Sequence, residues 1–123
     1  MMVVFGGEWF NELGSCLELA TDGSGVLSGS FAPGVGPAGR RALVGRYDTC
    51  STGAGAVLGW TVAWSSGRGE SASVTSWSGQ YLPEEERIVA HWLFTTATGV
   101  EDAWRATAIG QDVFWRRPSD TAP

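Results

Sequence analysis

The residues of this chain that could carry out chemistry are few. The sequence holds one histidine, His91, and two cysteines, Cys16 and Cys50. One histidine excludes a multi-histidine metal site, and two cysteines are too few for a four-cysteine zinc site. No nucleophile has a base beside it, so the sequence indicates no catalytic residue, no metal site and no cofactor. What remains is hydrogen bonding by polar side chains that lie among tryptophans.

The clearest example is the segment Glu8–Leu19, which we expect to be the first strand. Apolar residues alternate along it with period two, and the charged residues lie at even positions. The even face is therefore expected to face water, and the odd face, with Trp9 and Leu17, to face the core. Asn11 and Ser15 share this odd face, so the pattern places an amide and a hydroxyl where apolar residues are usual.

Later strands repeat this mixture of indoles and short polar side chains on the face expected to point inward. The inward set comprises Phe31, Trp60, Val62, Trp64, Ser71, Ser73, Thr75, Trp77, Trp92, Asp112 and Phe114. A barrel filled by its own side chains would mostly carry leucine, isoleucine and valine there. Buried polar groups without partners cost about 1–3 kcal/mol each, and a small polar ligand between tryptophan walls would supply the missing partners.

Each of these features also has a simpler interpretation. Tryptophans at alternating positions commonly pack a barrel core without any ligand. The serines and threonines of the expected strand Glu70–Tyr81 would be exposed if the alternation of inward and outward side chains along it were shifted by one residue. Asn11 would also suit a turn, and Asp112 would also suit an exposed strand start, the commoner place for an aspartate. His91 has the opposite parity to its tryptophan neighbour and is expected on the outer surface.

Short strands must position these side chains, because period-two alternation recurs along the whole chain and no long helical period is present. Gly-rich connectors separate the strands, the longest being Ala32–Gly39. An all-β fold follows, either a closed barrel or a two-sheet sandwich. Even spacing without a long crossover favours an eight-stranded antiparallel up-and-down β-barrel with a ligand pocket at one open end. The expected strands are Glu8–Leu19, Val26–Phe31, Arg41–Thr49, Ala56–Ser65, Glu70–Tyr81, Ile88–Thr95, Arg105–Ile109 and Asp112–Arg117.

The composition limits the domain organisation and the partners. A chain of 123 residues is long enough for one core, and we expect an N-terminal tail over 1–6, a barrel domain over 7–117 and a C-terminal tail over 118–123. The net charge is −5, so no basic surface for nucleic acid is expected. No apolar run approaches the roughly 18 residues that cross a bilayer, which argues against a membrane partner.

Several segments, taken together in chain order, carry a family resemblance. They are Trp9–Ser15 (WFNELGS), Gly45–Asp48 (GRYD), Leu58–Trp64 (LGWTVAW), Thr75–Tyr81 (TSWSGQY), Trp92–Leu93, Ala103–Trp104 and Gly110–Asp112 (GQD). Each segment alone is a weak signal, whereas the ordered set is specific. It resembles the avidin/streptavidin family of biotin-binding proteins, closer to bacterial streptavidin than to egg-white avidin. The resemblance extends from about Gly7 to Phe114.

The resemblance implies a barrel that binds biotin without catalysis. By motif position, Asn11 and Ser15 would donate hydrogen bonds to the ureido oxygen, and Asp112 would accept one from a ureido N–H. Thr75 would face the thioether sulfur, and Ser73 would meet the valerate carboxylate. Indoles would wall the bicyclic ring. The remaining ligand-contact positions are Leu13, Phe31, Pro33, Val35, Trp64, Trp77 and Trp92.

Two positions depart from the family pattern at the ureido end. Phe31 stands where the family usually has a tyrosine hydroxyl that donates to the ureido oxygen. Pro33 stands where a serine usually accepts from the second ureido N–H, and the loop after it, Gly34–Gly39, is one residue shorter than in streptavidin. Each lost hydrogen bond weakens binding by about 0.5–1.5 kcal/mol. We therefore expect biotin binding that is weaker than in the strongest binders of the family.

The resemblance also implies assembly. Trp104 matches a tryptophan that family members place across a subunit interface onto the neighbour's ligand. A homo-oligomer is therefore expected, with a tetramer favoured over a dimer, and the alternative is that Trp104 folds over the mouth of its own barrel. Family membership would further imply secretion, although Met1–Gly7 lacks the basic and apolar regions of a signal peptide.

Two other functions stay open at this point. Because Phe31 and Pro33 alter the ureido end, the barrel would instead suit another small heterocycle or a biotin-like peptide. A Trp-rich sandwich that binds carbohydrate is the third possibility, and it would expose an aromatic platform on one sheet.

The two cysteines are expected to be free thiols. Cys16 lies on the outward face of the first expected strand, and Cys50 follows the third, which we place at the same end of the barrel. Two strand spacings of about 4.8 Å separate these strands, which exceeds the roughly 7 Å that a disulfide allows between Cα atoms.

Overall fold

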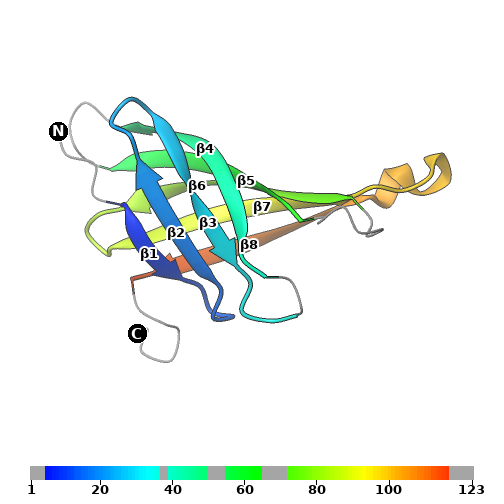
Figure 1. Ribbon diagram of the computed structural model, residues 1–123, viewed down its shortest axis with the longest axis horizontal. Helices are drawn as coiled ribbons and strands as arrows, with labels where there is room; N and C mark the ends of the chain where they lie inside the picture. Colours follow the sequence, from blue (N-terminus) through cyan, green and yellow to red (C-terminus); the bar gives the residue numbers. More distant parts are fainter. Residues whose placement is uncertain (1–4, 37–38, 50–54, 65–71, 117–123) are drawn as a thin grey trace.

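The computed structural model describes residues 5–36, 39–49, 55–64 and 72–116, whose strands close into a barrel (Figure 1). Each strand is antiparallel to the next in chain order, and the first strand meets the last. The expected up-and-down barrel is confirmed, and the sandwich alternative is wrong. The strands are β1 (Gly7–Phe10), β2 (Cys16–Thr21), β3 (Val26–Ala32), β4 (Arg41–Thr49), β5 (Ala56–Ala63), β6 (Ser73–Leu82), β7 (Arg87–Thr96) and β8 (Thr107–Trp115).

The first expected strand, Glu8–Leu19, is in fact two strands joined by a tight turn. Asn11 causes the break, because its Oδ1 accepts hydrogen bonds from the backbone N–H groups of Leu13 (3.0 Å) and Ser15 (2.9 Å). Gly14 completes the turn with a φ of +80°, a conformation that favours glycine. Both interpretations of Asn11 therefore hold, since it forms the turn and its side chain is also buried.

At the other end of the chain, two expected strands are in fact one. Arg105–Ile109 and Asp112–Arg117 were expected to be separate, but the structure has a single continuous strand there, β8. Gly110 suggests an interruption, yet it stays in the ladder opposite Trp92. A Cβ at this position would lie 2.0 Å from Cζ2 of Trp92, so glycine here leaves room for the indole. The two errors cancel in the strand count.

The alternation along the strands assigned the inward faces correctly. Apolar residues fill the core, and the polar residues buried with them are Asn11, Ser15, Thr75 and Asp112. His91 is exposed on the outer surface, as expected. Ser71 of the expected inward set lies outside the described residues. The apolar core comprises Phe5, Trp9, Leu17, Leu19, Leu27, Phe31, Leu43, Ala56, Leu58, Trp60, Val62, Trp77, Tyr81, Ile88, Ala90 and Phe114.

The two ends of the barrel differ. We call the end at which β1 leads to β2, β3 to β4, β5 to β6 and β7 to β8 the rim. Phe5 closes the opposite end, where its ring centroid lies 5.3 Å from that of Tyr47 and 5.9 Å from that of Tyr81. Its carbonyl accepts a hydrogen bond from Nε1 of Trp9 at 2.7 Å. Phe5 precedes the expected domain start at Gly7, but its side chain is only 1% exposed and belongs to the core.

Barrel closure between β1 and β8 is short, with Phe10 and Trp115 as the one registered pair. Arg116 supplies a second connection directly after β8. Its guanidinium lies 3.9 Å from the ring centroid of Trp9, and its Nη1 donates to the carbonyl of Gly6 at 2.6 Å. A cation over an indole contributes about 0.5–2 kcal/mol, depending on how far it is desolvated. This contact helps to hold β1, and therefore the turn that follows it.

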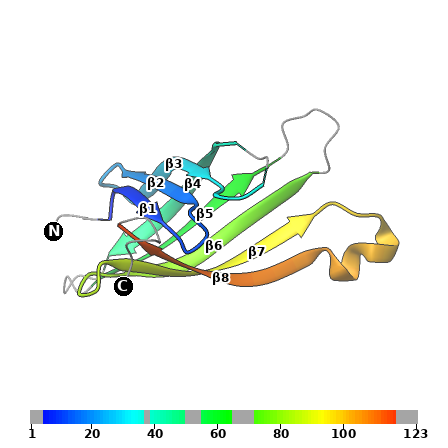
Figure 2. The ribbon, with the colours of Figure 1, turned by 90° about the horizontal axis from the view of Figure 1, so that it is seen from below.

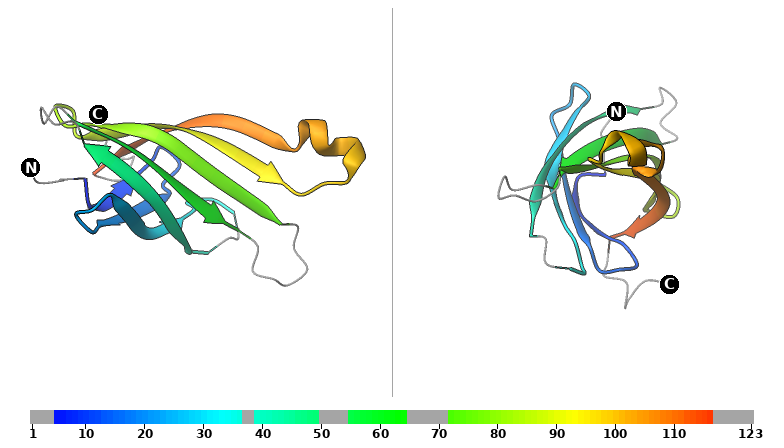
Figure 3. Two further views of the ribbon diagram at one scale, coloured as in Figure 1. Left: turned by 90° about the horizontal axis from the view of Figure 1, so that it is seen from above. Right: turned by 90° about the vertical axis from the view of Figure 1, so that its right-hand side faces the viewer.

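The hairpin of β7 and β8 extends past the other strands at the rim and carries a 3-10 helix, η1 (Val100–Arg105), at its tip (Figure 2). Figure 3 shows this arm from above and along its length. The sequence pattern did not predict η1, because a 3-10 helix of six residues is too short for a helical period to be recognised. Within the described part of the chain, no helix is long and apolar enough to cross a membrane.

Cys16 begins β2 and carries a free thiol. Cys50 lies outside the described residues. Thr49, the residue before it, ends β4 away from the rim, whereas Cys16 pairs with Ala32 beside the rim. The expectation that Cys16 and the end of the third expected strand share one end of the barrel is therefore wrong, because the turn after β1 places Cys16 at the start of β2.

Candidate functional site

Four polar side chains from three separate parts of the chain are buried inside the barrel. Asn11 and Ser15 come from the turn between β1 and β2, Thr75 from β6 and Asp112 from β8. Their exposed fractions are 2%, 4%, 5% and 7%, in that order. This burial decides between the interpretations that the sequence left open, because Asp112 is no surface residue and Thr75 does not face solvent.

Asp112 is the central group of this cluster. Its Oδ2 accepts a hydrogen bond from Nε1 of Trp77 at 2.8 Å, and its Oδ1 accepts one from Nδ2 of Asn11 at 3.3 Å. Burial raises the pKa of the Asp112 carboxyl above its ordinary value. The hydrogen bond from Trp77 opposes this rise in pKa, and the negative charge of Glu12 adds to it.

The cluster keeps hydrogen-bonding capacity that the protein itself does not use. Oδ1 of Asn11 is occupied by two backbone N–H groups and Nδ2 bonds Asp112, which leaves one amide N–H. Oγ of Ser15 accepts from the backbone N–H of Gly34 at 3.0 Å, so its own proton is free to be donated. The carboxylate of Asp112 retains acceptor lone pairs. The site thus offers two donors beside one charged acceptor.

Aromatic rings surround this cluster. Phe31 lies 4.9 Å from Trp77 and 5.8 Å from Trp64, measured between ring centroids, and Trp60 stacks on the other side of Trp77 at 5.4 Å. Nε1 of Trp64 donates to Oγ1 of Thr75 at 2.8 Å, which fixes both side chains. Trp64 and Trp92 are only partly buried. The walls of the site are therefore rigid indoles, some of which remain accessible.

The other predicted site residues lie on or beyond the rim. Ser73 and Pro33 are half-buried, whereas Leu13 and Val35 are exposed on the turns that border the rim. Trp104 is 82% exposed on η1, so the alternative that it folds over its own barrel is wrong. The structure thus brings together the predicted site residues that form the buried polar cluster and the aromatic rings around it. Trp104 lies apart from them.

Sequence reasoning missed the part that Gly34 plays. Its backbone N–H binds Ser15, and a Cβ at this position would lie 2.2 Å from the carbonyl oxygen of Leu13. Glycine is therefore needed for the loop to approach the turn closely enough to orient the serine hydroxyl. The only sequence signal was a glycine directly after a proline, which many turns share.

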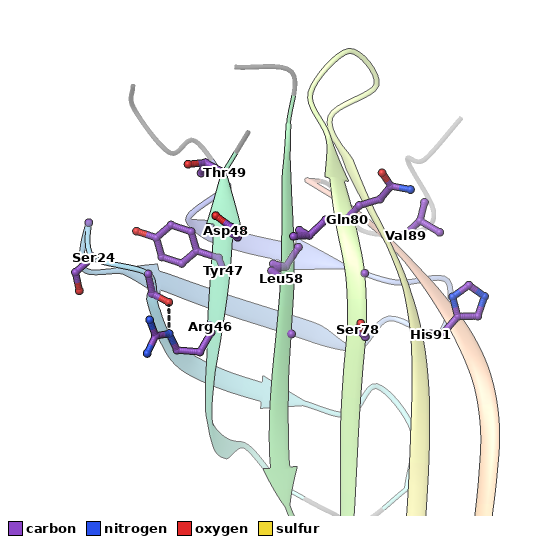
Figure 4. A pocket seen from close by; sticks show the side chains of 15 residues that line it. Ser24, Arg46, Tyr47, Asp48, Thr49, Leu58, Ser78, Gln80, Val89 and His91 are labelled. Atoms are coloured by element: carbon purple, nitrogen blue, oxygen red, sulfur yellow. Dashed lines mark hydrogen bonds between the residues drawn. The ribbon is translucent and has the colours of Figure 1, made fainter. Parts of the chain in front are cut away.

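A separate hollow of about 940 Å³ lies on the outer surface over β4 to β7 (Figure 4). Gly59 and Gly79 are among the residues that line it. Arg46, which donates to the carbonyl of Gly25, lies at one edge, and His91 lies at the other. The buried polar residues do not line this hollow. Among the described residues, no group of three or more His, Cys, Asp or Glu side chains is placed to hold a metal ion.

The family comparison agrees with this geometry. Residues 2–117 match the sequence model of the avidin family. The chain belongs to the avidin family. The match covers all the strands of the barrel, including the three segments that supply the buried polar cluster. The resemblance drawn from the sequence motifs is thereby confirmed, and the cluster lies in an avidin-family barrel.

We predict that Asp112 makes stability depend on pH. Its folded-state pKa is raised, so above pH 3.8 the folded state holds a proton that the unfolded chain, with the ordinary pKa of 3.8, has already lost. The unfolding free energy of the parent protein, minus that of Asp112→Asn, should therefore fall as pH rises from about 3.8 through the raised pKa. Urea denaturation of both proteins between about pH 3 and 7 measures this difference. A difference that is flat or increases with pH contradicts the prediction.

Proposed function

We propose that this protein binds biotin without catalysing a reaction. The observation that carries the proposal is the buried Asp112 carboxylate beside two unused donors, the amide of Asn11 and the hydroxyl of Ser15. A cyclic urea has the complementary pattern, since its polarised oxygen accepts hydrogen bonds from several donors and its adjacent N–H donates one. Membership of the avidin family supports biotin as the urea-containing ligand.

In this proposal the polar head of biotin lies among the buried polar side chains, and its tail points out of the barrel toward the half-buried Ser73. Asn11 and Ser15 donate to the ureido oxygen, and the negative charge of Asp112 balances the polarised urea. Thr75, whose hydroxyl already accepts from Trp64, donates its proton toward the thioether sulfur. Ser73, half-buried near the rim, binds the valerate carboxylate. The bicyclic ring packs against Trp64, Trp77 and Trp92, while Leu13, Pro33 and Val35 cover it from the rim.

A second candidate is another small heterocycle, or a peptide that mimics biotin. The observation that favours it is Phe31, which is 5% exposed and supplies a ring edge where a hydroxyl would complete the ureido site. A ligand whose carbonyl oxygen needs only two hydrogen-bond donors would not bind more weakly for the lack of a hydroxyl at Phe31. A carbohydrate module is not supported, because Trp9, Trp60 and Trp77 are buried inside the barrel instead of forming a surface platform.

We further propose that the protein acts as a homo-oligomer outside the cell. Trp104 and Val100 of η1 and Ile109 of β8 expose large apolar surface on the arm that projects past the rim. A second copy is the proposed occupant, with Trp104 covering the partner's ligand and a tetramer favoured over a dimer. Exposed tryptophans of this kind are common binding hot spots, and family membership supports both the assembly and the extracellular location.

Calorimetric titration tests the proposed ligand. We predict one biotin bound per chain, together with a rise in the melting temperature. Asp112→Ala should weaken binding by about tenfold to a hundredfold, because a hydrogen bond to a charged group is lost, about 1.5–3 kcal/mol. Trp92→Ala should also weaken binding strongly, whereas Asp48→Ala on the outer surface should not. Absence of both heat and thermal shift in the parent protein contradicts the proposal.

Phe31→Tyr should strengthen biotin binding. The added hydroxyl would donate a third hydrogen bond to the ureido oxygen, worth about 0.5–1.5 kcal/mol, or roughly 2–12-fold in Kd. Phe10→Tyr, which adds the same hydroxyl on the outward face of β1, is the matched control and should leave Kd unchanged. If Phe31→Tyr binds biotin no better than the parent, the ureido oxygen does not lie beside Phe31.

Trp104→Ala should speed the dissociation of biotin about tenfold or more, as expected on losing an interfacial tryptophan. Val100→Ala, on the same 3-10 helix, should have a much smaller effect. Stopped-flow or competition kinetics measure the rate, and light scattering measures the mass of each protein. A monomeric parent protein, or equal effects of the two substitutions, would rule out the bridging role of Trp104.

A further inference from the structure

An arginine stands on the inward face of the barrel at the rim. Arg41 is the first residue of β4 and has the same parity as Leu43, which is buried. Across the ladder it pairs with Phe31, also on the inward face. Charged residues are uncommon on such faces, and the sequence analysis assigned Arg41 no role.

Arg41 lies beside Trp64, whose neighbour Ser73 is proposed to meet the ligand's tail. Leu43 pairs with Val62, and continuing this register by two residues places Arg41 opposite Trp64, the residue that follows the end of β5. The backbone N–H of Trp64 donates in turn to the carbonyl of Ser73 at 3.0 Å. Arg41 and Ser73 therefore flank Trp64 on neighbouring strands at the rim.

The guanidinium of Arg41 is held in place but is not neutralised. Its Nε donates to the carbonyl of Trp64 at 3.2 Å, and its Nη1 donates to the carbonyl of Arg40 at 3.3 Å. These two bonds leave three of its five N–H donors available. Within the described residues no carboxylate pairs with Arg41, whereas Arg87 and Arg105 each pair with one.

We infer that Arg41 binds the anionic end of the ligand and makes the site selective for acids over neutral analogues. The inference rests on the proposed function, because it takes the ligand's head to lie at Asp112 and its tail at the rim. A guanidinium suits a carboxylate, which accepts two parallel N–H bonds. Its charge also offsets the repulsion of an anion by a protein of net charge −5.

Arg40 is the matched control for this role. It neighbours Arg41 in sequence and carries the same charge, but its side chain is exposed and donates to Oγ of Ser30, which has outward parity on β3. General attraction of an anion by nearby positive charge would involve both arginines. Direct contact with the ligand would involve Arg41 alone.

The experiment compares biotin with biotinamide, its analogue with a neutral tail, by calorimetric titration at neutral pH. The parent protein should bind biotin about tenfold more tightly than biotinamide, as expected for a charge-assisted hydrogen bond at a half-exposed site. Arg41→Gln should lose this preference by weakening the binding of biotin alone. Arg41→Lys should keep part of it, and Arg40→Gln should match the parent.

The outcomes separate the two proposals. The inference is overturned if biotinamide binds but the parent shows no preference for biotin. It is also overturned if Arg41→Gln weakens the binding of both ligands equally. In either case Arg41 only connects β4 to the end of β5. An equal loss of preference in Arg40→Gln would likewise replace direct contact by long-range attraction. If neither ligand binds the parent, the proposed function itself is wrong.

Discussion

The burial of one carboxylate is the constraint on which the rest of this structure depends. Asp112 is removed from water, and a buried carboxylate is tolerated only where donors surround it. Those donors are Trp77 and Asn11, which lie 35 and 101 residues away in sequence. Asn11 reaches Asp112 only when β1 closes on β8, so the contacts of Phe10 with Trp115 and of Arg116 with Trp9 are conditions for the site as well as for the barrel.

Much of the fold was predictable from the sequence, because period-two alternation reports which face of a strand is buried whatever its exact ends. Asn11, Thr75 and Asp112 were assigned inward for this reason, and the structure buries all three. Strand boundaries failed where one residue overrides the pattern. Asn11 ends a strand by bonding two backbone N–H groups, and Gly110 continues one because an indole occupies the space of its missing side chain.

The remaining features depend on how the strands pair with one another, and the order of residues along the chain does not give this pairing. Arg41 has the same parity as Leu43, but the absence of a carboxylate partner among the described residues is seen only once β4 is paired with β3 and β5. The exposure of Trp104 likewise depends on how far β7 and β8 extend beyond the other strands at the rim. The hydroxyl of Ser15 has its free proton because Gly34 approaches it from another loop.

These positions together suggest how binding energy is distributed along the barrel. In the proposed complex Phe31 supplies no donor, so the head of biotin would be held by Asn11, Ser15 and Asp112. At the rim Arg41 adds a positive charge beside Trp64. Because ion pairs near solvent are screened by salt while buried hydrogen bonds are not, binding through the tail depends on ionic strength and binding through the head does not. Affinity in this barrel would then be a sum of two parts, one sensitive to the chemistry of the head and one to the charge of the tail.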